Sequence, residues 1–327
     1  MREKFEDRRL TGQINVACKY DDGTVRYWTT TKEEVVEHIV QIVEEYEAEG
    51  YVLTLRQLHY QLVSNNWIVN HDTAYKKLGD ILDDCRYAGI IDWEAVEDRG
   101  RVPHLLYQVD SVTEALEDTV EQYRRNRQEG QEKEVELWTE KDALSGILKR
   151  TTEKYQIRLV VNKGYTSSSA IYRAYQRVLK TILYGRQFVI LYFGDHDPSG
   201  LDMVRDISDR LFFMLSNGRY SSTFEDSGID LSEALRIVPI GLTKKQINQY
   251  NLPPNPTKLT DSRAKKYISK HGRTCWEVDA LKPQTLTAIV ESHIQNEIDM
   301  DLYNLMMETE AADIENLRGI IDGLDKE

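Results

Sequence analysis

The chain has 327 residues, of which 40% are hydrophobic, and a formal net charge of -13 at pH 7. This length can bury one large core or two ordinary ones, and no apolar run is long enough to cross a membrane. The acidic balance argues against a protein that coats nucleic acid through bulk charge, but it leaves room for local basic strips.

Residues 1–110 are predicted to form the first domain. Their charged opening, MREKFEDRRL, contains no apolar segment, so we expect no secretory signal. Two β-rich runs, GQINVACKY and TVRYWTT, flank an Asp-Asp-Gly turn at residues 21–23. This pattern indicates a β-hairpin.

Three helices with polar caps are expected in the rest of this domain. Their expected caps and ends are Thr31 with Gly50, Thr54 before LRQLHYQLV, and Asp72 with Gly89. Three helices with short links, together with strands, are typical of a helix-turn-helix or winged-helix domain.

Residues 111–134 are predicted to connect two domains. The stretch is polar and charged, has helical spacing and lacks a strong apolar face. Its opening, SVTE, places Ser111 and Glu114 at the spacing of a capping box.

Residues 135–327 are predicted to form an α/β domain. The strands VELWTE, RLVVNKG, QFVILYFGD and RIVPIGL alternate with the helical segments DALSGILKRTTEKY, SSAIYRAYQRVLKTIL and GLDMVRDISDRLFFML. This alternation favours a mostly parallel sheet flanked by helices on both faces. Two more helices are expected near residues 262–269 and 283–299.

Charge is unevenly distributed towards the end of the chain. Residues 241–273 hold eight Lys and Arg against Asp261 alone, whereas residues 286–327 hold eleven acids against Arg318 and Lys326. We interpret the acidic tail as solvated surface. For the basic strip, solvated surface and nucleic-acid contact are equally supported. The candidate contacts are Lys244, Lys245, Arg263, Lys265 and Lys266.

The three cysteines lie far apart in the chain, at Cys18, Cys85 and Cys275. Such a sparse, odd set predicts reduced thiols in a cytoplasmic protein and does not have the spacing of a zinc site.

Three carboxylates follow strands of the predicted sheet. Glu140 ends VELWTE, and Asp195 and Asp197 lie in GDHDPSG at the end of the apolar run FVILYF. Residues i and i+2 of an extended segment point the same way, and the crevice of an open α/β sheet lies beyond the carboxyl ends of its strands. Converging carboxylates favour a hard dication such as Mg²⁺.

A more ordinary interpretation is a βα turn in which Asp197 or Ser199 caps the next helix. The Asp-x-Asp pattern alone favours that interpretation. Glu140 at the end of a second strand shifts the balance towards a metal site.

The segment TLRQLHYQLV carries a candidate nucleophile. Arg56 and Tyr60 are four residues apart and share a helix face, while His59 points away from it. Tyr60 can be a structural aromatic of the core. Alternatively, its phenolate attacks a phosphodiester whose charge Arg56 neutralises.

The segments ELWTEKDAL, KGYTS and ILYFGDHDPSG, in this order, resemble the Toprim domain of topoisomerases and related nucleases. TLRQLHY resembles the catalytic winged-helix domain of the topoisomerase VI A subunit and of the meiotic double-strand-break transesterase. GLTKKQINQYNLPPNPTKLTDSRAKKY and CWEVDAL are similar to the following part of that family. The resemblance covers roughly residues 31–294 and is closest to the stand-alone mini-A proteins of mobile elements and viruses.

The resemblance implies a type IIB topoisomerase-like DNA transesterase. Tyr60 would form a 5′-phosphotyrosyl link with double-stranded DNA, and Arg56 would hold the phosphate. Glu140, Asp195 and Asp197 would bind Mg²⁺ or Mn²⁺, with Glu140 also serving catalysis. The family works as a homodimer in which the tyrosine of one subunit meets the metal site of the other.

The resemblance also implies a prokaryotic cytoplasmic, nucleoid or virus-encoded protein. No part of the sequence resembles the ATPase of the B subunit, so an ATPase would be a separate partner subunit. No membrane partner is expected.

Five further polar or charged side chains lie near these motifs in the sequence. Lys141 can contact phosphate or face outward, and Glu277 and Asp279 are interpreted as structural. His59 stands where many relatives carry an aromatic residue. His196 separates the two aspartates, and we expect it to point away from them, on the surface or behind the ligands.

Two other functions remain compatible with the sequence. One is a Toprim nuclease that hydrolyses DNA while Tyr60 is structural. The other is a DNA-binding or bridging dimer that does not cleave.

Overall fold

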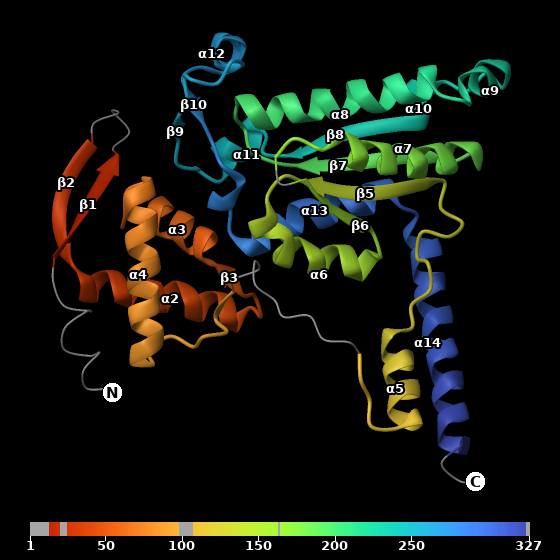
Figure 1. Cartoon of the computed structure of the whole chain (residues 1–327), viewed down its shortest axis with the longest axis horizontal. Coiled ribbons are helices and arrows are strands. Elements are labelled where there is room, and N and C mark those ends of the chain that lie inside the picture. Colours follow the sequence, from red (N-terminus) through yellow and green to blue (C-terminus); the bar gives the residue numbers. More distant parts are fainter. Residues whose placement is uncertain (1–12, 20–24, 98–106, 163, 325–327) are drawn as a thin grey trace.

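The computed structural model describes residues 13–19, 25–97, 107–162 and 164–324 (Figure 1). Its centre is a four-stranded sheet with the strand order β6-β5-β7-β8, in which every neighbouring pair is parallel. The strands are β5 (Lys133–Thr139), β6 (Arg158–Val161), β7 (Gln187–Phe193) and β8 (Leu235–Gly241). The predicted α/β class and parallel sheet are confirmed.

Helices cover both faces of this sheet, as predicted (Figure 1). Along β7, Phe188, Ile190 and Tyr192 pack on one face, while the alternate residues Val189, Leu191 and Phe193 pack on the other. Helices α7 (Ser168–Leu183) and α8 (Pro198–Asn217) cover the first face, and α6 (Ser145–Tyr155) and α13 (Pro283–Glu297) cover the second. Because β7 is buried on both faces of the sheet, its sequence is continuously apolar.

The N-terminal part has its own core. It contains the antiparallel pair β1 (Gln13–Lys19) and β2 (Val25–Thr31), the helices α2 (Lys32–Ala48), α3 (Leu55–Ser64) and α4 (Asp72–Ala88), and the two-residue parallel pair β3 (Leu53–Thr54) and β4 (Val96–Glu97). The predicted pairing of the first two strands is confirmed, although the turn at residues 21–23 lies outside the described residues. An apolar cluster from α2, α3 and α4 forms the core.

Capping explains where these helices begin and end. Thr31 and Thr54 each form a capping box, and Gly89 ends α4 in the left-handed conformation, as predicted. The prediction that Asp72 caps α4 is wrong: Asp72 is the first helical residue, and the side chain of His71 accepts from the amide of Thr73. An imidazole nitrogen is a less usual cap than a carboxylate, which is why the sequence pattern pointed to Asp72.

The N-terminal part packs directly on the sheet domain. Helix α3 lies against the short helix η2 (Val278–Ala280). The Tyr51 hydroxyl lies 3.3 Å from that of Thr287, and Arg150 donates to the carbonyl of Gly50 at 2.8 Å. Tyr51 also packs against both apolar cores. Contacts between the two parts therefore hold α3 at the sheet edge.

The connector is helical only in part. Helix α5 (Val112–Gln122) begins after Ser111, whose side chain accepts from the Glu114 amide as predicted, whereas the Glu114 carboxylate accepts from the amide of Asp110 and not of Ser111. The remainder up to β5 is irregular. Beside α5 runs the 25-residue helix α14 (Met300–Leu324), and both extend away from the sheet (Figure 1).

The acidic tail is more than solvated surface, which corrects our interpretation of its charge. Glu310 of α14 is buried, and its carboxylate pairs with the buried guanidinium of Arg127 at 2.8 Å. It also accepts from the amide of Arg125 at 2.8 Å. The acids of α14 thus tie this helix to the irregular part of the connector.

Smaller elements complete the fold. They are η1 (Asp142–Leu144), α9 (Ser221–Asp226), α10 (Leu231–Ala234), α11 (Lys244–Gln249), β9 (Asn255–Pro256), α12 (Ala264–His271) and β10 (Thr274–Cys275). The two helices predicted near residues 262–269 and 283–299 correspond to α12 and α13. Cys85 and Cys275 are buried free thiols. None of the helices in the described ranges has the length and apolar character needed to cross a membrane.

Replacing Glu310 by Ala should destabilise the protein by about 3 kcal/mol, because the buried Arg127 charge loses its partner. Urea unfolding followed by circular dichroism measures this loss. The matched control is Glu315→Ala on the same helix, where the side chain is exposed and little change is expected. Equal effects of the two substitutions would contradict the structural role of the pair.

Candidate functional site

The register of two parallel strands brings the predicted carboxylates together. Thr139 of β5 lies opposite Phe193 of β7, so the residues that follow both strands leave the sheet at the same level. Asp197 and Asp195 lie close enough to Glu140 to influence its pKa. The convergence of Glu140, Asp195 and Asp197 on one metal ion stays a prediction.

The GDHDPSG turn is held tightly. The Gly194 amide donates to the carbonyl of Gly241 at 2.9 Å, and Asp197 caps α8 by accepting from the amide of Gly200 at 2.6 Å. A Cβ at position 200 would collide with the carbonyl of Asp195, so only glycine allows this approach. The helix-capping interpretation of Asp197 is thus correct, and capping occupies only one of its two oxygens.

His196 points away from the two aspartates as expected, but it is buried, which corrects the surface option. Its backbone pairs with that of Trp276 through hydrogen bonds of 2.9 and 3.1 Å. Its Nδ1 lies 2.9 Å from the hydroxyl of Tyr267. His196 therefore anchors the segment around Trp276 beside the acidic turn.

That segment brings two more carboxylates to the site. The amide of Val278 donates to Asp195 Oδ1 at 2.9 Å, which places Glu277 and Asp279 on either side of this bond. Asp279 is fully buried, whereas the Glu277 side chain is 25% exposed. Interpreting Glu277 and Asp279 as purely structural overlooked that both lie beside the acidic turn. Their i, i+2 spacing, which repeats that of Asp195 and Asp197, was the sequence feature that could have indicated this position.

The Lys141 ammonium lies at the centre of the cluster. It is 2.8 Å from Asp195 Oδ2, 2.9 Å from Asp279 Oδ2 and 3.2 Å from Glu277 Oε2. Burial alone would lower the pKa of Lys141, but these three carboxylates hold it well above its usual range. The possibility that Lys141 faces outward is therefore wrong, because an unpaired cluster of buried carboxylates costs more than burying one ammonium among them.

One ammonium does not compensate all of this negative charge. Burial raises the pKa of Asp195 well above its ordinary value, against the opposing effect of Lys141. Burial likewise raises the pKa of Glu140 and of Asp197. The cluster therefore retains affinity for protons or for a further cation.

Tyr60 reaches the edge of this cluster from α3. It is 8% exposed, and its ring centroid lies 6.0 Å from the Lys141 ammonium. Burial and then the Glu277 charge raise the pKa of Tyr60 above its usual range. Tyr60 therefore lies on the Lys141 and Glu277 side of the cluster.

Arg56 shares this helix face with Tyr60, as predicted. The charges of Tyr60, Asp279 and Glu277 act to raise the pKa of Arg56, against the opposing effect of burial. Arg56 also lines a cavity of about 500 Å³ between the N-terminal helices and the sheet domain, together with Arg86, Tyr75 and Asp142. His59 points elsewhere and is buried, in edge contact with Tyr60 and Tyr75.

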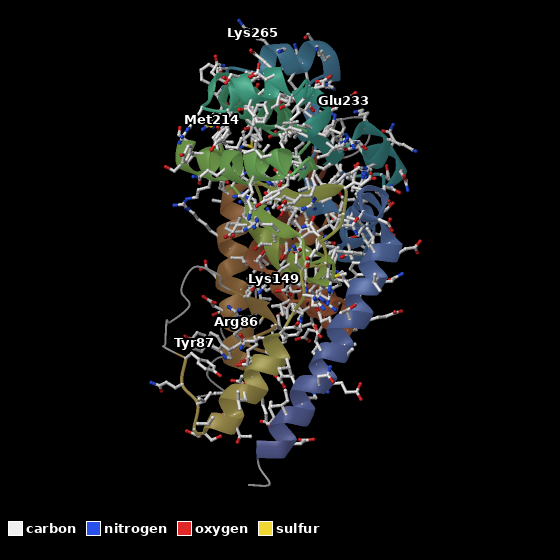
Figure 2. All side chains as sticks on the ribbon, turned by 90° about the vertical axis from the view of Figure 1, so that its right-hand side faces the viewer. Arg86, Tyr87, Lys149, Met214, Glu233 and Lys265 are labelled. Atoms are coloured by element: carbon white, nitrogen blue, oxygen red, sulfur yellow. The ribbon has the colours of Figure 1, made fainter. Side chains whose placement is uncertain are left out.

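The basic strip lies on α11, on α12 and in the loop before α12. Lys245, Lys265 and Lys266 are exposed, and Figure 2 shows Lys265 at one end of the molecule. Lys244 is also exposed, and its ammonium stands 3.7 Å from the ring centroid of Trp276. These four lysines remain accessible to an anionic partner.

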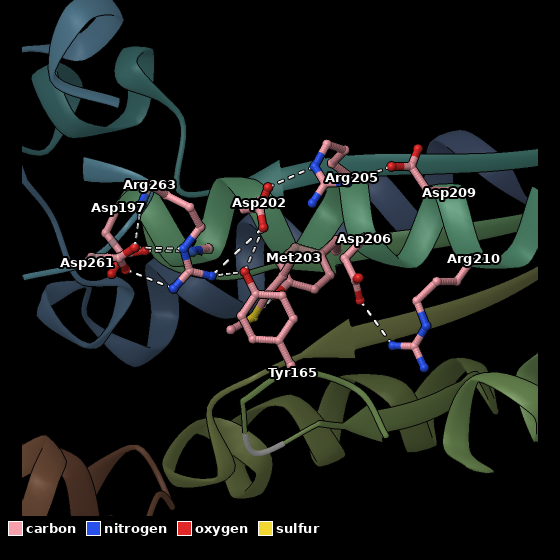
Figure 3. A network of polar contacts seen from close by, with 12 residues as sticks. Tyr165, Asp197, Asp202, Met203, Arg205, Asp206, Asp209, Arg210, Asp261 and Arg263 are labelled. Atoms are coloured by element: carbon pink, nitrogen blue, oxygen red, sulfur yellow. Dashed lines mark hydrogen bonds and ion pairs between the residues drawn. The ribbon is translucent and has the colours of Figure 1, made fainter. Parts of the chain in front are cut away.

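Arg263 differs from these lysines because acids already engage it (Figure 3). Its Nε lies 2.7 Å from Asp261 Oδ1, and its Nη1 lies 3.8 Å from Asp202 Oδ2. It lines a cavity of about 230 Å³ between α8 and α12 with Lys266, Lys270 and His271. Arg263 therefore contributes less free charge than the neighbouring lysines.

The donor set suits a hard dication chemically. Glu140, Asp195 and Asp197 offer only oxygen ligands, and Asp279 Oδ1 is buried without a hydrogen-bond partner. Among the described residues, no group of three or more His, Cys, Asp or Glu side chains is already arranged to hold a metal. The Lys141 ammonium instead lies between Asp195 and Asp279.

Comparisons with protein-family models, with curated proteins and with solved structures give no match for this chain.

Replacing Lys141 by Met should destabilise the protein at pH 8 by about 3 kcal/mol, because Asp195 and Asp279 lose their buried cation. A carboxyl whose pKa is raised in the folded state, such as that of Asp195, destabilises the fold only at pH values above its unfolded-state pKa. The loss of stability in Lys141→Met should therefore shrink as the pH falls towards 4. Urea unfolding at several pH values measures both effects. Lys149→Met, whose side chain is 68% exposed, is the control. A loss that grows at low pH would contradict the assignment.

Proposed function

We propose that this protein is a Mg²⁺-dependent DNA-cleaving transesterase of the type IIB topoisomerase A class. In this proposal the N-terminal part is a winged-helix domain and the parallel sheet belongs to a Toprim domain. The observation that carries the proposal is the position of Tyr60, whose ring centroid lies 6.0 Å from the Lys141 ammonium, which in turn lies 2.8 Å from Asp195 Oδ2. A tyrosine in the core without a catalytic role has no need of a neighbouring acidic crevice.

The reaction would exchange one phosphodiester for another. The Tyr60 oxygen attacks a DNA phosphorus, the bond from phosphorus to the 3′ oxygen breaks, and the 5′ phosphate remains on the tyrosine. Arg56 is placed to neutralise negative charge on the phenol oxygen and on the incoming phosphate. A Mg²⁺ or Mn²⁺ ion held by Glu140, Asp195 and Asp197 would supply charge stabilisation to the phosphate and the leaving oxygen.

Double-stranded DNA fits the accessible positive charge. Arg56 and Arg86 line a cavity, and the exposed side chains of Lys244, Lys245, Lys265 and Lys266 present ammonium groups without requiring a basic chain overall. Arg263 would also bind a DNA phosphate once that phosphate displaces Asp261 from its guanidinium. Such phosphate contacts position DNA without reading its sequence.

We further propose a homodimer in which the tyrosine of one subunit meets the metal site of the other, as the resemblance implies. Two such sites in a dimer would cut two strands, and an ATPase would come from a separate subunit.

The first test is a covalent adduct. Supercoiled plasmid incubated with the protein and Mg²⁺ or Mn²⁺, then quenched with detergent, should yield protein-linked DNA. Tyr60→Phe should abolish the adduct because the attacking oxygen is gone. The control is Tyr87→Phe, which alters an exposed tyrosine of the same domain and should leave the adduct intact.

Two other outcomes would contradict the proposal and identify the alternatives. Free nicks that persist in Tyr60→Phe indicate hydrolysis by a Toprim nuclease. DNA that is retained intact, with Asp195→Asn behaving like the unaltered protein, indicates a binding or bridging dimer.

Co-expression of Tyr60→Phe and Asp195→Asn chains tests where the site is completed. We expect partial recovery of the adduct, because Tyr60 of the Asp195→Asn chain can act at the intact acidic cluster of the Tyr60→Phe chain. Absence of any adduct would show instead that each tyrosine acts within its own chain. A parallel mixture of Tyr60→Phe with unaltered chains controls for the stability of mixed dimers.

A further inference from the structure

The cleft between α8 and α12 combines apolar and cationic side chains. Its volume is about 230 Å³. Pro198, Leu201 and Tyr267 form its apolar wall. The other lining residues are four Lys or Arg side chains, His271 and a single acid, Asp202. An apolar wall together with a few charged groups suits a small anionic ligand.

Three of the four cations come from the beginning and one face of α12. Arg263, Lys266 and Lys270 are three and four residues apart, so their side chains project from the same side of the helix. Lys266 and Lys270 are exposed, and neither forms an ion pair with any residue of the described ranges. Like charges at this spacing repel each other. An anion bound between the two ammonium groups would offset that repulsion.

An acid already occupies the guanidinium of Arg263 (Figure 3). Arg263 Nε donates to Asp261 Oδ1 at 2.7 Å, and Nη2 donates to Oδ2 at 2.8 Å. The Arg263 amide also donates to Asp261 Oδ1, at 2.9 Å. Two parallel bonds of this kind are also the way in which arginine binds a phosphate. Asp261 therefore holds the position that a phosphate would take at Arg263.

The fourth cation, Arg205 of α8, is compensated by acids on its own helix. Its Nε lies 2.8 Å from Asp202 Oδ1, and its Nη1 lies 2.6 Å from Asp209 Oδ2. The free positive charge of the cleft is consequently that of Lys266 and Lys270.

We propose that the cleft between α8 and α12 binds a phosphate group through Lys266, Lys270 and Arg263. The organic part of the ligand would lie against the apolar wall. On binding, the phosphate replaces Asp261 as the partner of the Arg263 guanidinium. Two sources can offer such a group, a free nucleotide and the backbone of a DNA strand. The assignment stands on the side chains of the cleft and does not rest on the proposed function.

Titration calorimetry with a nucleoside monophosphate tests the site, with EDTA present so that no divalent ion recruits phosphate to the carboxylate cluster. Combining Lys266→Gln with Lys270→Gln should weaken binding about 10- to 100-fold, because charge-assisted hydrogen bonds are lost. The matched control combines Lys245→Gln with Lys265→Gln. This pair removes the same charge from exposed lysines that do not line the cleft, and it should leave the affinity unchanged. The nucleoside without its phosphate should not bind.

A second variant should change the affinity in the opposite direction. Asp261→Asn should strengthen binding up to about 5-fold, because Arg263 no longer pairs with a carboxylate. Asparagine keeps the oxygen that accepts from the Arg263 amide, so the beginning of α12 is preserved. Asp226→Asn makes the same charge change at an exposed position outside the cleft and should have no effect. Damage to the fold cannot produce tighter binding.

Duplex DNA distinguishes the two sources of phosphate. If the DNA backbone supplies it, the cleft pair of substitutions should weaken duplex binding more than the control pair at the same salt concentration. Equal losses, together with a nucleotide defect confined to the cleft pair, assign the cleft to a free nucleotide. The proposal is overturned if the cleft and control pairs differ for neither ligand. These measurements require no cleavage, so a missing covalent adduct would refute the proposed function without bearing on this site.

Discussion

The ion cluster around the Lys141 ammonium is the interaction on which the rest of this structure depends. It joins the end of β5, the end of β7 through Asp195, and the η2 segment through Glu277 and Asp279. Several buried carboxylates can lie this close together in their ionised form only when a cation lies among them. The same cluster reaches Tyr60 through Glu277, so it also links the sheet domain to the N-terminal helices.

The η2 segment decides which groups meet at this point. It is fixed by the backbone pairing of His196 with Trp276 and by the bond from the Val278 amide to Asp195. Helix α3 packs on it and thereby presents Tyr60 to Glu277. Residues from α3, from η2 and from the ends of β5 and β7 are consequently brought together from distant parts of the chain.

Local patterns predicted much of the architecture. Strict strand–helix alternation identified the parallel sheet, because parallel strands need crossover helices, and Thr31, Thr54 and Gly89 marked helix boundaries. For the acidic residues near the end of the chain, the local sequence did not distinguish buried from solvated side chains. An acid that will be buried against Arg127, such as Glu310, has the same local sequence signature as a solvated one. Only its distant partner distinguishes the two.

The sequence by itself determined the α/β class, the strand ends and the oxygen-rich character of the candidate site, because these follow from periodicity and residue type over short windows. Tertiary structure alone decided that Lys141 points inward, that Glu277 and Asp279 join the cluster, and that Tyr60 lies against them. Those contacts join residues far apart in the chain. Their energies depend on burial and mutual charge compensation, which no local pattern contains.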